Sequence, residues 1–238
     1  PPFLRGLYFE DEQFPTDIFV LLIFAAFWVY KTLKRDKRLL VTPLDYASLG
    51  FALVYMISLV VSVSMRGAFG EWLKYFMYFA VFIMISELAD SYRSRIAIIC
   101  TIIGSALGIS LLGIDGVAGA KAASVLNTFF KNVNILDNFF LIFSKNRDAF
   151  FGLFVGGRIN STIQYPNALA SYLLAVYFVA LGVMTASKSI WTKLVSGAAS
   201  YILLITFILT LSRGVYVLLP VAAVLYILLL PKERRVRG

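Results

Sequence analysis

Long apolar runs alternate with short polar segments along the chain, and this pattern predicts helices that cross a membrane. A helical span needs about 20 mostly apolar residues. Several of the runs approach that length, and none shows the short alternating strands of a membrane barrel. The predicted spans cover residues 16–30, 44–64, 72–88, 96–114 and 166–186, with two more inside the run 194–230.

The last apolar run must break, because it continues for 37 residues from Leu194 to Leu230. A single helix of that length would be about 55 Å long, against a hydrocarbon core of about 30 Å. The only polar interruption is Ser212-Arg213-Gly214. We therefore expect two spans that meet at this tripeptide.

Basic residues cluster at the ends of the apolar runs and predict the orientation of the spans. Five lie between Lys31 and Arg38, and 13 of the 22 Lys and Arg residues fall on the side that this cluster defines as cytoplasmic. This placement orients spans and disfavours nucleic-acid binding, although the net charge is +9. With 60% hydrophobic and 15% charged residues, we predict an all-α, polytopic transmembrane helical bundle of about seven spans, with residues 1–238 as a single transmembrane domain.

Residues 115–165 are predicted to form an extracytoplasmic loop, which is too long to be a plain connection. Apolar residues recur within it at near-helical spacing, with Lys, Asn and Asp between them, and this indicates an amphipathic helix at the membrane interface. The alternative is a helix that spans the membrane, which would invert the orientation of every later span. The apolar positions are Val125, Leu126, Phe129, Phe130, Val133, Leu136, Phe140 and Phe143.

The sequence offers little for acid–base or metal chemistry. It contains no histidine, and its single cysteine, Cys100, lies inside an apolar run. Metal-ligand spacing, a phosphate-binding Walker loop and a Ser-His-Asp set are all missing from the sequence. We therefore predict no metal and no cofactor.

Three arginines on the predicted outer face are candidate ligands of an anion, because arginine is disfavoured on that side. Arg66, Arg158 and Arg213 each lie next to a glycine, which permits close backbone approach. Guanidinium groups gathered in a partly desolvated pocket would bind a diphosphate bidentately. The alternative is that each arginine reaches separately to lipid phosphates.

Polar residues precede the span that begins at Pro166, a residue suited to the first turn of a helix. A helix N-terminus beside Arg158 would attract phosphate oxygens. The polar side chains could contact sugar hydroxyls, or could instead cap helices and solvate the loop. These candidates are Asn160, Ser161, Thr162 and Gln164 before Pro166, Asn167 directly after it, and Ser212 in the later Ser-Arg-Gly tripeptide.

Two of these segments resemble the O-antigen ligase and O-antigen polymerase family. Residues 157–173 read G-R-I-N-S-T-I-Q-Y-P-N-A-L-A-S-Y-L. They are similar to that family's G-R-x-x-(S/G)-T-x-x-x-P-N-x-x-A-x-x-L segment. Residues 210–214, T-L-S-R-G, are similar to its T-x-S-R-G signature. The resemblance covers the N-terminal part of the family's length, so we expect a fragment of a longer protein.

The resemblance implies a GT-C-like, inverting and metal-independent membrane glycosyltransferase of the bacterial cytoplasmic membrane. Such enzymes move a glycan from an undecaprenyl-diphosphate carrier to a glycan, lipid or protein acceptor on the outer face. Arg158 and Arg213 match the family's arginines that bind the donor diphosphate, and Arg66 is the third candidate. Family members place a histidine, proposed to activate the acceptor, in a later outer loop, so we expect these residues alone to be inactive.

Two other classes of function remain open from the sequence. A transporter or flippase of a lipid-linked oligosaccharide would use the same arginines without chemistry. A purely structural membrane subunit would not need them for donor binding.

Overall fold

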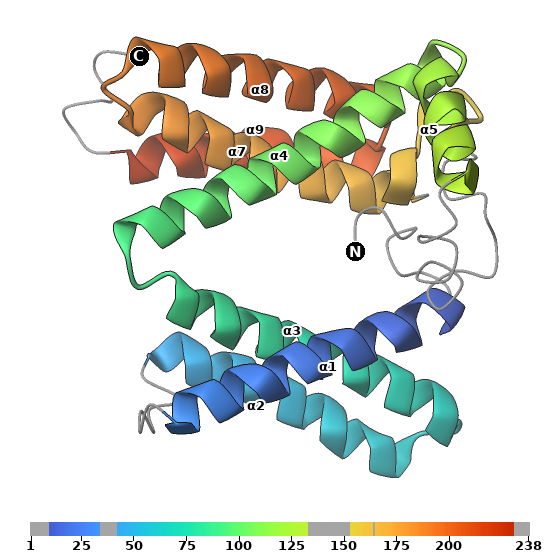
Figure 1. Ribbon diagram of the computed structural model, residues 1–238, viewed down its shortest axis with the longest axis vertical. Helices are drawn as coiled ribbons and strands as arrows, with labels where there is room; N and C mark the ends of the chain where they lie inside the picture. Colours follow the sequence, from blue (N-terminus) through green and yellow to red (C-terminus); the bar gives the residue numbers. More distant parts are fainter. Residues whose placement is uncertain (1–9, 34–41, 133–152, 164, 231–238) are drawn as a thin grey trace. The chain divides into compact units, whose positions relative to one another are not determined.

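The computed structural model describes residues 10–33, 42–132, 153–163 and 165–230. The described residues separate into two compact units, one formed by Glu10–Ile98 and the other by the described residues from Ile99 onward. Helices dominate both units (Figure 1). Six helical segments within the described ranges are long and apolar enough to cross a membrane, which confirms the all-α prediction.

The unit Glu10–Ile98 consists of three helices and the start of a fourth. Helices α1 and α2 both pack against α3, and Ala52, Phe79 and Ile83 form its buried core. The helices are α1 (Glu10–Leu33), α2 (Pro43–Ser58), which is followed by the 3₁₀ turn Leu59–Val61, and α3 (Met65–Leu88).

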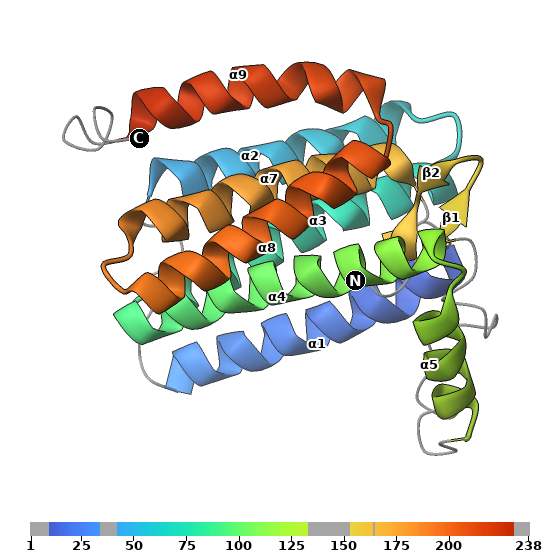
Figure 2. The same ribbon diagram turned by 90° about the horizontal axis from the view of Figure 1, so that it is seen from above.

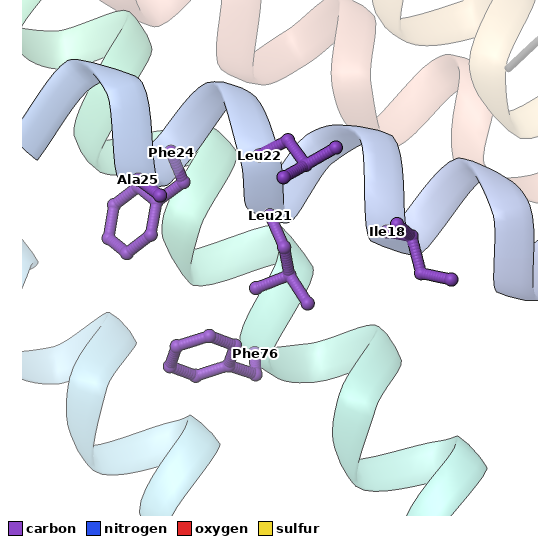
Figure 3. Close-up of a pocket in the computed structure, with 6 residues that line it drawn as sticks. All are labelled: Ile18, Leu21, Leu22, Phe24, Ala25 and Phe76. Carbon is purple, nitrogen blue, oxygen red and sulfur yellow. The ribbon is translucent and has the colours of Figure 1, made fainter.

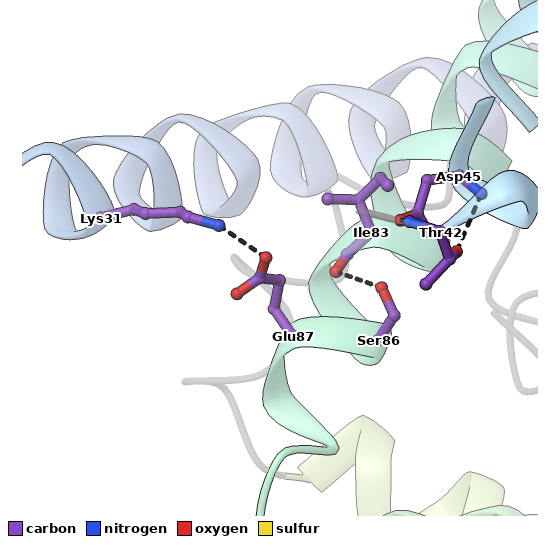
Figure 4. A network of polar contacts seen from close by, with 6 residues as sticks. All are labelled: Lys31, Thr42, Asp45, Ile83, Ser86 and Glu87. Atoms are coloured by element: carbon purple, nitrogen blue, oxygen red, sulfur yellow. Dashed lines mark hydrogen bonds and ion pairs between the residues drawn. The ribbon is translucent and has the colours of Figure 1, made fainter. Parts of the chain in front are cut away.

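Polar contacts fix one end of this unit (Figure 4). Lys31 is a buried residue with 4% of its surface exposed, and its ammonium nitrogen lies 2.5 Å from a carboxylate oxygen of Glu87, which joins α1 to α3. Asp45 and Thr42 form a capping box at the start of α2, in which each side chain accepts a hydrogen bond from the other's backbone N–H. The capping box begins α2 one residue before the predicted start of the span 44–64.

The predicted spans 44–64 and 72–88 leave residues 65–71 as a connection, and this is wrong, because these residues form the first two turns of α3. The Ser64 side chain accepts a hydrogen bond from the Gly67 N–H and caps the helix. Glycines and an arginine suggested a loop, but a serine cap outweighs the weak helix propensity of Gly67 and Gly70. Arg66 therefore belongs to the first turn of α3.

An apolar pocket lies between α1 and α3 (Figure 3). It offers no polar side chain that could bind a charged group, so it is not a candidate for the anion site. Its lining residues are Ile18, Leu21, Leu22, Phe24, Ala25 and Phe76.

The second unit is built around α7 (Pro166–Ala186), which packs against α8 (Ile190–Leu209) and α9 (Arg213–Leu229) (Figures 1 and 2). Hydrogen bonds join the starts of α7 and α9 through Asn167 and Ser212 and their later turns through Thr185 and Tyr226, so these two helices are parallel. The observed bounds of α7 match the predicted span. Buried residues from α4, α7, α8 and the segment between α4 and α7 form one core: Ile109, Ile159, Leu169, Leu173, Leu203 and Phe207.

Helix α4 (Tyr92–Val117) meets the segment that precedes α7 through two glycines. A Cβ atom at Gly113 would lie 2.6 Å from Cγ2 of Ile159, and one at Gly116 would lie 2.7 Å from Cβ of Leu153. Only glycine allows this close approach. The last turns of α4 and residues 153–159 therefore lie together at one end of the unit.

Helix α5 (Lys121–Asn132) follows α4 and runs at a steep angle to it (Figures 1 and 2). The Asp115 carboxylate accepts hydrogen bonds from the backbone N–H groups of Ala122 at 3.1 Å and Ala123 at 2.9 Å, and so caps α5. The helix is amphipathic and overlaps the first part of the predicted interfacial helix. The rest of that prediction, from Val133 onward, lies outside the described residues.

Candidate functional site

Arg158 lies in a short β-hairpin, in which a two-residue turn joins two strands of two residues each. Strand β1 (Phe154–Val155) pairs antiparallel with β2 (Arg158–Ile159), and Val155 lies opposite Arg158. The turn residues Gly156 and Gly157 have φ angles of 61° and 76°, which glycine adopts without strain. Sequence reasoning missed this hairpin, although two glycines between short β-prone segments are its usual signal.

The two residues of β2 serve different purposes because side chains alternate along a strand. Ile159 is fully buried and packs in the core of the unit. Arg158 is partly exposed. The packing of Ile159 against Gly113 thus fixes the position from which the Arg158 side chain extends.

The Arg158 guanidinium donates hydrogen bonds to two neutral acceptors. Nε donates to the backbone carbonyl of Thr210 at 2.9 Å, and Nη2 donates to Oδ1 of Asn167 at 3.4 Å. Within the described ranges no carboxylate forms an ion pair with Arg158. The positive charge is therefore anchored in place without being neutralised by these contacts.

Asn167 joins the two segments that carry the sequence motifs. Its Oδ1 atom also accepts a hydrogen bond from the buried hydroxyl of Ser212 at 2.9 Å. Hydrogen bonds thus join Asn167 to Ser212, 45 positions later in the sequence, and Arg158 to Thr210, 52 positions later. The start of α7, strand β2 and the turn between α8 and α9 come together at one end of the unit.

The turn between α8 and α9 is tightly constrained. Thr210 and Ser212 are fully buried, and Leu211 between them has a φ of 50°, an uncommon left-handed conformation for a residue with a Cβ atom. Arg213 follows at the first position of α9 and is exposed. In the part of the chain that the structure describes, no hydrogen bond or ion pair holds its side chain.

Two helices begin beside these arginines without side-chain caps. Neither Tyr165 before α7 nor Ser212 before α9 forms a capping hydrogen bond with its side chain. Free N–H groups at a helix start carry partial positive charge and attract anions. Two guanidinium groups and two helix starts without side-chain caps thus lie at this end of the unit.

The predicted sugar-contacting residues lie in different environments. Ser161 and Thr162 are fully buried, and the Ser161 hydroxyl donates to the carbonyl of Ile109 at 2.6 Å, which favours a role in packing against α4. Oδ1 of Asn160 is buried and has no hydrogen-bond partner among the residues described. Gln164 lies outside them.

Arg66 belongs to the other unit, and its side chain is outside the described part of the structure. Its place in a diphosphate site stays a prediction. The glycines beside the three arginines differ: Gly157 has a left-handed φ, whereas Gly67 and Gly214 lie within helices, and no atom lies within 4 Å of a Cβ position at Gly157 or Gly214. Among the described residues, no group of three His, Cys, Asp or Glu side chains could hold a metal ion.

The fold defines the class of protein: a multi-pass α-helical membrane protein. The chain matches no family model, no curated protein and no solved structure. A more particular function must therefore be argued from the motifs and from the contacts that join them.

Proposed function

We propose that this protein is a membrane glycosyltransferase of the O-antigen ligase or polymerase type. It would move a glycan from an undecaprenyl-diphosphate carrier to an acceptor at the outer face of a bacterial cytoplasmic membrane. The observation that carries the proposal is the contact of Arg158 with Thr210 and Asn167, because it joins the two motifs on which the resemblance rests.

The chemistry of these residues suits a diphosphate leaving group. Guanidinium groups bind phosphate oxygens bidentately, and positive charge that is already in place stabilises the charge that develops as the glycosidic bond breaks. Arg158 is held by neutral acceptors, and Arg213 is exposed one residue beyond Ser212. Such a site would need no metal and no proton transfer to the leaving phosphate.

The packing of α4 supports the proposed topology. Gly116 lies against Leu153, so the chain between these residues starts and ends at the same end of the unit. A segment that returns to its starting end adds no net crossing, which favours an outer loop at residues 115–165. With α9 as a further, 17-residue apolar helix, the proposed total is seven spans in a GT-C-like arrangement.

The test is a glycan-transfer assay with the full-length protein in membranes, using a polyprenyl-diphosphate-linked oligosaccharide as donor. We expect Arg158→Ala and Arg213→Ala each to reduce transfer about 100-fold or more, since each removes charge from the leaving-group site. Lys188→Ala is the matched control, because Lys188 is exposed at the opposite end of α7. Full activity of both arginine variants would contradict the proposal, as would movement of the donor across the membrane without transfer.

A further inference from the structure

We propose that Asn167 is a positioning residue that orients Arg158 toward an anionic ligand while leaving its charge uncompensated. This inference rests on the proposed function, because it concerns the same diphosphate site. It assigns Asn167 a role beyond starting α7. The carrying observation is that a single atom, Oδ1 of Asn167, accepts from both Arg158 and Ser212.

The choice of an amide at this position has a chemical reason. A carboxylate of the same shape would accept the same two hydrogen bonds. It would also form an ion pair with Arg158. The carboxylate would then neutralise the guanidinium charge and weaken its attraction for an anionic ligand. A neutral acceptor orients the Arg158 guanidinium group without neutralising its charge. The second anchor of Arg158, the carbonyl of Thr210, is also neutral.

Ser212 extends the same arrangement to the second arginine. Its hydroxyl is fully buried and donates to Asn167, so it does not cap the helix that begins at the next residue. The first residue of α9, Arg213, is thereby tied through its neighbour to the first turn of α7. One amide oxygen links the supports of both arginines.

A purely structural role for Asn167 predicts that an aspartate leaves the binding of an anion unchanged. Aspartate is favourable in the first turn of a helix, because its charge complements the helix dipole. It would also keep both hydrogen bonds. On that view Asn167→Asp is neutral or stabilising, whereas our inference requires it to weaken the binding of an anion.

The experiment measures the binding of a polyprenyl diphosphate to the full-length protein in nanodiscs, with the uncharged polyprenol as a second probe. We expect Asn167→Asp to keep the melting temperature of the wild type and to weaken diphosphate binding about tenfold or more, with polyprenol binding unchanged. In the transfer assay the KM for the donor should rise while the KM for the acceptor stays constant. Ser189→Asp is the matched control, because it adds the same charge at the start of α8, which is at the other end of the unit.

Asn167→Ala and Ser212→Ala keep the inference testable if the aspartate variant fails to fold. Asn167→Ala removes the acceptor without adding charge, so diphosphate binding should weaken by a smaller factor, and Ser212→Ala should weaken it less again. Wild-type binding by Asn167→Asp or Asn167→Ala, with Arg158→Ala impaired, would overturn the inference and leave the proposed function standing. Wild-type binding by Arg158→Ala itself would instead overturn the proposed function.

Discussion

At the scale of single residues, close packing of a glycine decides where Arg158 lies. Gly113 on α4 leaves room for Ile159, the residue that follows Arg158 on β2. The position of the Arg158 guanidinium therefore depends on Gly113, which is uncharged and belongs to neither sequence motif. The sequence does show Gly113, but its contact with Ile159 follows from how α4 meets the hairpin.

Gly113→Ala should destabilise the protein and displace the hairpin. The added methyl group would lie 2.6 Å from Cγ2 of Ile159, and overpacking of this kind costs about 1–3 kcal/mol. Thermal unfolding in detergent measures the loss. Gly104→Ala on the same helix is the control, because nothing lies within 4 Å of its Cβ position, so it should be neutral or slightly stabilising. Equal effects of the two variants would argue against the close contact.

The Lys31–Glu87 pair gives a second test at this scale. Glu87→Gln removes a carboxylate that faces the buried Lys31 ammonium group and should lower the free energy of unfolding by about 1–3 kcal/mol. Glu71→Gln in the exposed pair with Lys74 is the control and should cost about 1 kcal/mol or less. A similar loss from both variants would show that the burial of Lys31 does not strengthen the effect.

At the scale of elements, the apolar pattern and the start signals located the helices well. Pro166 after a polar segment and the basic residues beyond Ala186 gave the observed bounds of α7. The pattern failed where local hydrogen bonds decide the outcome. The Ser64 cap extends α3 back to Met65, and the Gly156-Gly157 turn forms a hairpin where only a polar segment was expected.

Asp115→Ala should loosen α5 without disturbing α4. The variant removes the acceptor of the Ala122 and Ala123 N–H groups, and loss of a helix cap costs about 0.5–2 kcal/mol. Hydrogen exchange of the α5 amides should become faster. Asp90→Ala, at an exposed carboxylate before α4, is the control and should leave α5 exchange unchanged. Unchanged exchange in Asp115→Ala would rule out the cap.

At the scale of the whole molecule, the placement of basic residues predicted the orientation of the spans. In the second unit, the two sequence motifs lie at the same end, where hydrogen bonds join them. The contact between Arg158 and Thr210 could not be derived from the sequence, because it depends on how α7, α8 and α9 pack. The motifs gave candidate residues, while the helix packing shows which of them meet. The position of Arg66 relative to this end stays a prediction.

Cysteine labelling of intact cells tests the proposed topology. In a background with Cys100 replaced by serine, Leu211→Cys and Gly156→Cys should react with a membrane-impermeant maleimide, because both residues are exposed and lie at the proposed outer face. Ser189→Cys, between α7 and α8, should react only after the cells are permeabilised. The reverse pattern would place the arginines at the cytoplasmic face and contradict the proposed enzyme.

The most direct measurement is a double-mutant cycle on the affinity of the full-length protein for a polyprenyl diphosphate. If Arg158 and Arg213 bind one diphosphate together, Arg158→Ala and Arg213→Ala should each weaken binding, and their effects should be coupled by about 0.5–3 kcal/mol. Wild-type affinity in either single variant, or strictly additive effects in the double variant, would contradict a shared donor site.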